Sequence, residues 1–105
     1  MPLYLDELWL DWSSPEAGRQ ALERLLPMAE PGFPWPPGVT LVAGPWFSNE
    51  ERKIVLVLDI VDHAATFPAF GMTLVHGLFA RRRLSPIVGW SAVRDLVGML
   101  TSPGT

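Results

Sequence analysis

The chain has 105 residues and carries 8 basic and 11 acidic side chains, which gives a net charge of −3. Because 49% of its residues are hydrophobic, it can build a core, and this excludes an intrinsically disordered chain. The absence of cysteine excludes disulfides, thiolate metal sites and thiol nucleophiles, and the negative charge argues against nucleic-acid binding.

The N-terminal part is predicted to form a strand followed by a helix. Residues 3–12 alternate as in a strand, with one face made by Leu8, Leu10 and Trp12 and the other by Leu5, Glu7, Trp9 and Asp11. Ser13 and Glu16 have the spacing of a capping box, which indicates that a helix begins there. Pro27 is expected to end this helix close to Leu26.

A proline-rich loop is predicted from Met28 to Gly38, within a segment, residues 27–38, that holds five of the 11 prolines. A strand is predicted to follow over residues 39–47. One of its faces would carry Val39, Leu41, Ala43 and Phe47, and the other Thr40, Val42, Gly44 and Trp46. Pro45 has no backbone N–H, so we expect an edge strand or a bulge at this position.

The third strand is predicted from Lys53 to Val61. After Lys53 it is continuously apolar apart from Asp59, which indicates that both of its faces are covered. Asp62 has the character of a helix N-cap, and the apolar spacing favours a helix over residues 63–79. Pro68, Gly71 and Gly77 leave open the alternative that residues 72–79 form a strand.

A last strand is predicted over residues 84–90, with the loop Arg81-Arg82-Arg83 before it. Ser91 is expected to cap a short C-terminal helix, and residues 101–105 to form a flexible tail. The order of elements predicts one α+β domain over residues 1–100, a ferredoxin-like βαββαβ fold with an antiparallel sheet and a C-terminal helix. One sheet face is too apolar and aromatic to remain in water, so a partner subunit is expected to cover it.

Several short motifs also resemble a known group of proteins. They are Leu8-Trp9-Leu10-Asp11-Trp12, Pro36-Pro37-Gly38-Val39, Gly44-Pro45-Trp46 and Pro86-Ile87-Val88. In their order and spacing they resemble the dimeric α+β barrel superfamily, and within it a small bacterial family of unknown function related to antibiotic-biosynthesis-monooxygenase-like folds. The resemblance implies a homodimer in which two sheets pack face to face, and it implies no settled reaction.

The first candidate site is the mixed face of the strands. It would bring together Glu7, Trp9, Asp11, Trp46 and Asp59. Carboxylates beside aromatic rings in a partly dry space acquire raised pKa values and act as acids or bases. The alternative is that Glu7 and Asp11 lie on a solvated surface or at a dimer rim, and that Asp59 ends a strand.

His76 and Arg81 are the remaining candidates. Histidine suits proton transfer near neutral pH, but His76 has no obvious carboxylate partner, and this favours a surface residue over a catalytic one. Arg81, with Arg82 and Arg83, would bind an anion or form a solvated loop. No metal is expected, because the sequence has no converging set of ligands.

Two functions remain open at this stage. One is a homodimeric small-molecule-binding or interaction module without cofactor. In it the segment Phe33-Pro34-Trp35-Pro36-Pro37 would be either a stiff lid or a ligand for an aromatic-grooved partner. The other is a cofactor-free enzyme, monooxygenase-like or isomerase-like, with a tryptophan-lined pocket. No membrane-spanning run and no signal peptide is recognised, so a cytoplasmic location is expected.

Overall fold

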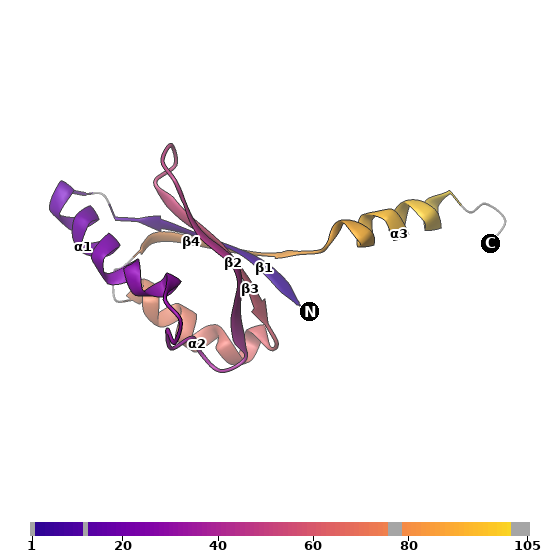
Figure 1. The fold of residues 1–105 in the computed structure, drawn as a ribbon, viewed down its shortest axis with the longest axis horizontal. Helices are drawn as coiled ribbons and strands as arrows, with labels where there is room; N and C mark the ends of the chain where they lie inside the picture. Colours follow the sequence, from indigo (N-terminus) through magenta and orange to yellow (C-terminus); the bar gives the residue numbers. More distant parts are fainter. Residues whose placement is uncertain (1, 12, 76–78, 102–105) are drawn as a thin grey trace.

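The computed structural model describes residues 2–11, 13–75 and 79–101. Its elements follow the order β-α-β-β-α-β-α, with one 3₁₀ turn after the first helix (Figure 1). In chain order they are β1 (Leu3–Leu10), α1 (Pro15–Leu25), a 3₁₀ turn (Leu26–Ala29), β2 (Val39–Ser48), β3 (Lys53–Ile60), α2 (His63–Val75), β4 (Phe79–Ile87) and α3 (Trp90–Leu100). The predicted α+β, ferredoxin-like class is confirmed.

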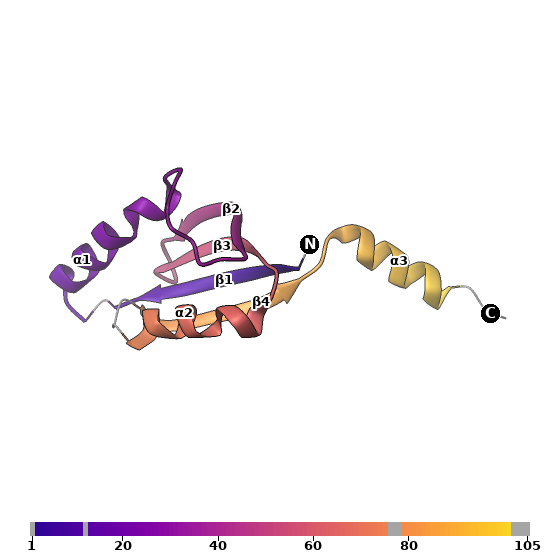
Figure 2. The ribbon, with the colours of Figure 1, turned by 90° about the horizontal axis from the view of Figure 1, so that it is seen from below.

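The four strands form one antiparallel sheet in the order β2-β3-β1-β4. The central strand β1 pairs with β3 on one side, where Leu8 lies opposite Ile54, and with β4 on the other, where Leu8 lies opposite Arg82. Helices α1 and α2 lie on the same side of this sheet (Figure 2). The sheet therefore has a helix-covered face and an open face.

The hydrophobic core lies between the helices and the covered face. Every second residue of β3 points into it, so Leu56 and Leu58 have no exposed surface and Ile60 has 1%. Leu8 and Leu10 of β1 join them, as their predicted shared face requires. Burial of these branched side chains contributes about 1.5–3 kcal/mol each.

Side chains alternate along each strand, so the residues between those that point into the core make the open face. It carries Leu5, Glu7 and Trp9 of β1, Lys53, Val55, Val57 and Asp59 of β3, Ala43 and Trp46 of β2, and Arg81 and Arg83 of β4. The side chains of β3 on this face are half-buried. The prediction that both faces of the third strand are covered therefore holds, within the chain, for one face only.

The β2 strand departs from regular alternation. The pairing register shifts between Leu41 and Ala43 and again between Ala43 and Trp46. The first shift turns Ala43 to the open face, so its predicted place beside Leu41 is wrong. The irregularity at Pro45 and the edge position of β2 confirm the expectation drawn from that proline.

Three predicted boundaries are corrected by the structure. Ser14, not Ser13, caps α1, because its Oγ accepts the backbone N–H of Ala17 at 3.1 Å. The residue that caps α3 is Gly89, not Ser91. The last strand begins at Phe79, so the three arginines lie within β4 rather than in a loop.

The alternative of a strand over residues 72–79 is also corrected. Helix α2 continues to Val75, although Pro68 lies inside it. Residues 76–78 lie outside the described part, and Phe79 already belongs to β4. The N-cap role of Asp62 is confirmed, because its Oδ1 accepts the backbone N–H of Ala65 at 3.2 Å.

Helix α3 projects beyond the end of the sheet (Figures 1 and 2). It has no buried residue, and Trp90 and Leu100 are 77% and 75% exposed. The molecule is therefore elongated, with a longest dimension of 62 Å.

A candidate pocket beneath the proline-rich loop

A hollow lies between the covered face of the sheet, the two helices α1 and α2, and the loop 30–38. Its volume is about 260 Å³, just below the range of about 300–1,000 Å³ that is usual for small-molecule sites. Apolar and aromatic side chains make most of its wall, namely Leu8, Leu25, Met28, Phe33, Trp35, Phe70 and Phe79. The charged members of the wall are Asp6, Arg24 and Arg82. We call this hollow the loop pocket.

A buried ion pair forms the polar part of the loop pocket. Arg82 donates from Nε to Asp6 Oδ1 at 3.0 Å and from Nη2 to Oδ2 at 2.6 Å. The two side chains are 9% and 2% exposed. This two-bond geometry holds the guanidinium in one orientation.

The register of the sheet explains why these two residues meet. Position 6 of β1 lies opposite Leu84 of β4, and position 8 opposite Arg82, so both charged groups point to the covered face. Arg82 also lies over the ring of Phe70 in α2, with the guanidinium carbon 4.0 Å from the ring centroid. A cation over an aromatic face is stabilised by the ring quadrupole.

Burial raises the pKa of the Asp6 carboxyl, and the hydrogen bond and charge of Arg82 oppose this shift without cancelling it. A carboxyl group with a raised pKa in a pocket wall is a candidate for proton transfer and for recognition of a polar ligand.

The loop 30–38 covers the pocket with two aromatic rings. Phe33 and Trp35 meet edge to face, with centroids 4.8 Å apart, and both pack against the hydrophobic core. Proline residues on either side restrict the backbone of this segment. Of the two alternatives for this segment, a stiff lid or a ligand for an aromatic-grooved partner, the packing of both rings against the core favours the lid.

A second cation stands at the edge of the pocket. Arg24 is exposed on the last turn of α1, and within the described residues its side chain has no ion pair or hydrogen bond. The Nη1 amino group of Arg82 donates no hydrogen bond to Asp6, which accepts from Nε and Nη2. The pocket therefore offers guanidinium donors beside a mainly apolar wall, an arrangement that suits a small apolar molecule with a carboxylate group.

Most of the residues predicted as a site lie elsewhere, on the open face. Glu7 is ion-paired with Lys53, which also pairs with Glu51 at 2.6 Å. Lys53 and Arg81 flank the ring of Trp9, at 4.9 and 4.5 Å from its centroid. The pKa of Lys53 is raised by its hydrogen bonds, first to Glu51 and then to Glu7.

The structure brings only some of the remaining candidates to that face. Asp59 and Trp46 lie on it, and Asp59 Oδ1 is buried without a hydrogen-bond partner. Asp11 does not share it, because β1 ends at Leu10 and the Asp11 carboxylate accepts the backbone N–H of Ser13 at 2.9 Å. His76 lies outside the described residues.

Sequence reasoning missed Asp6 and Arg24, and it named Arg82 only as part of the three-arginine anion site or loop, without its partner Asp6. One signal was available for Asp6: it occupies the strand position between Tyr4 and Leu8, where alternation predicts a buried side chain. A carboxylate at such a position needs a buried partner. The partner is 76 residues away, and no local pattern identifies it.

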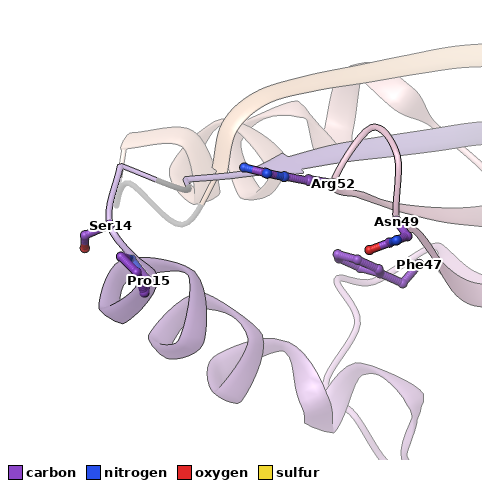
Figure 3. A pocket seen from close by; sticks show the side chains of 5 residues that line it. All are labelled: Ser14, Pro15, Phe47, Asn49 and Arg52. Atoms are coloured by element: carbon purple, nitrogen blue, oxygen red, sulfur yellow. The ribbon is translucent and has the colours of Figure 1, made fainter.

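Another hollow lies between the start of α1 and the β2–β3 hairpin. Figure 3 shows its lining side chains, Ser14, Pro15, Phe47, Asn49 and Arg52, spread around an open space. They bring no carboxylate and no histidine to it. The loop pocket is therefore the better candidate.

Comparisons with known proteins give no further guide. No family model, no curated protein and no solved structure matches this chain. Among the described residues, no group of three His, Asp or Glu side chains is placed to hold a metal ion. In the same part of the chain, no helix has the length and apolar character needed to span a membrane.

Proposed function

We propose that this protein is a small homodimeric module that binds a small, mostly apolar carboxylic acid in the loop pocket. The observation that carries the proposal is the buried Asp6–Arg82 pair in an otherwise apolar pocket wall. Buried ion pairs contribute little to stability compared with apolar replacements, which favours a role in recognition. Arg24 at the pocket edge supplies the second cation.

Titration with 1-naphthoate, followed by NMR of the ¹⁵N-labelled protein, tests this proposal. We expect saturable shifts at residues of the loop pocket, and much weaker binding of the neutral analogue 1-naphthamide. Arg24→Gln should weaken naphthoate binding about tenfold, which corresponds to the loss of one charge-assisted hydrogen bond. Arg19→Gln, on the exposed face of the same helix, is the matched control and should bind as the wild type does. Equal binding of the acid and the amide would contradict the proposal.

The homodimer is supported by the open face of the sheet. The pairing register places Leu5, Val55, Val57 and Trp46 together there, and no helix in the described part of the chain covers them. Contiguous apolar patches of this kind mark interaction sites. Two such faces packed together would give a dimeric α+β barrel, the architecture that the sequence motifs resemble, and a cytoplasmic location fits this assignment.

The raised pKa of Asp6 supports a second candidate, a cofactor-free enzyme of the isomerase type acting in the same pocket. Asp6 would accept a proton from an acidic C–H of the bound acid and return it elsewhere. Phenylpyruvate in D₂O is a suitable probe, because exchange of its methylene protons is visible by NMR. Faster exchange with the wild type than with Asp6→Asn would support this candidate, and equal rates would exclude it.

A further inference from the structure

Helix α3 is amphipathic and has no buried residue. Its apolar positions fall on one side at helical spacing, with Val93, Leu96, Val97 and Leu100 together and Ser91, Arg94 and Asp95 on the other side. Leu96 and Val97 are 53% and 51% exposed. A helix of 11 residues without a packing partner is marginal in water, so α3 requires a surface to pack against.

The chain has more surface than its size requires. Its accessible surface is 7258 Å², whereas a folded monomer of this mass exposes about 5,800 Å². The surplus of about 1,400 Å² lies within the range that one subunit of an obligate homodimer buries, about 1,000–2,500 Å². The radius of gyration, 17.0 Å, likewise exceeds the value of about 13 Å for a compact chain of this length.

The connection to β4 directs α3 away from its own sheet. Only Val88 and Gly89 separate the strand from the helix, and Gly89 is extended, with φ −67° and ψ 158°. The helix therefore continues past the end of the sheet (Figure 1). In this position no residue of α3 is buried against the core of its own chain.

We propose that α3 is an exchanged arm, whose apolar side packs on a second copy of this chain in the homodimer. This inference rests on the dimer put forward above and assigns α3 to its interface. In a two-fold assembly each copy gives one arm and receives one, so both projecting helices are covered at once.

Photo-crosslinking tests this assignment in the full-length chain. Leu96 is replaced by p-benzoylphenylalanine in an unlabelled chain, which is mixed with ¹⁵N-labelled wild type and irradiated. We expect crosslinked peptides that join the unlabelled α3 to the labelled partner. The same photoreactive residue at Ser91, on the polar side, should lose this inter-chain product.

The outcomes separate this inference from the dimer itself. A dimer in sedimentation with crosslinks confined to one chain would show that α3 folds back, which overturns the exchanged arm and leaves the dimer standing. A monomer at micromolar concentration would overturn both.

A pair of lysine variants gives an independent test. Val97→Lys should raise the dimer dissociation constant at least about 100-fold, because two valines per dimer lose their apolar contacts. Ser91→Lys should leave the constant unchanged. The helix dipole disfavours a cation at the start of α3 and favours one near its end. A loss of dimer affinity confined to Val97→Lys therefore does not arise from the effect of the new charge on the helix itself. An unchanged constant for Val97→Lys would overturn the arm.

Discussion

The Asp6–Arg82 pair is the residue-level feature on which the site depends. Both groups are withdrawn from water, and their two hydrogen bonds offset part of the desolvation cost. Removing one member leaves the other charge buried without a partner, which costs more than the pair itself is worth. This asymmetry makes the pair testable.

Arg82→Met should destabilise the fold by about 3–5 kcal/mol, measured by urea unfolding, because Asp6 then lies buried without its cation. Arg19→Met is the control. The ion pairs of Arg19 with Glu16 and Glu23 are more than half exposed and screened by solvent, so the loss of Arg19 should destabilise the fold far less than the loss of Arg82. Equal losses for the two variants would show that the buried pair has no special role.

The raised pKa of Asp6 sets the sign of a pH dependence. The folded state holds this proton more tightly than the unfolded state, where the pKa is near 3.8. The stability that this group contributes is therefore present in full below pH 3.8 and is lost as pH rises through the folded pKa. We expect the free energy of unfolding of wild type, relative to that of Asp6→Asn, to fall as pH rises above 3.8. Urea unfolding over this range checks it, and a difference that rises with pH would contradict it.

Among the elements, α1 shows how a single side chain decides a boundary. Ser13 and Ser14 are both suited to capping, but only the Ser14 hydroxyl accepts the N–H of Ala17. Ser14→Ala should cost about 1 kcal/mol in urea unfolding, while Ser13→Ala should change stability by less than about 0.5 kcal/mol. A larger loss for Ser13→Ala would restore the capping box that the sequence pattern favours.

Local pattern predicts most of the elements, since apolar alternation and turn residues are local signals. Strand β4 shows where prediction from local pattern fails. Arg81, Arg82 and Arg83 read as a polar loop, yet pairing with β1 places them in a strand, with the middle arginine buried beside Asp6. Pairing between segments 76 residues apart is a tertiary property, so neither the strand boundary nor the pocket follows from local composition.

The register of the open face, by contrast, was predictable. Alternation in the first strand correctly places Glu7 and Trp9 on one side, and alternation in the third places Asp59 with Val55 and Val57. Alternation does not predict which of the two faces of the sheet the helices cover. The predicted candidate site lies on the mixed, open face, whereas the loop pocket lies on the helix-covered side.

At the scale of the whole molecule, the open face and α3 leave apolar surface uncovered within one chain. Val57→Lys on the open face should convert the dimer to monomer in sedimentation, because the lysine replaces an apolar contact of this face and its ammonium group must be desolvated when two faces pack together. Val61→Lys is the matched control, since Val61 is 73% exposed just after β3. A Val57→Lys variant that remains dimeric would place the interface elsewhere.

Native mass spectrometry with 1-naphthoate tests the central claim most directly. We expect a species of twice the chain mass of 11.6 kDa, carrying up to two naphthoate molecules that are lost on denaturation. A single-chain species without naphthoate, under the same conditions, would contradict both the homodimer and the small-molecule site.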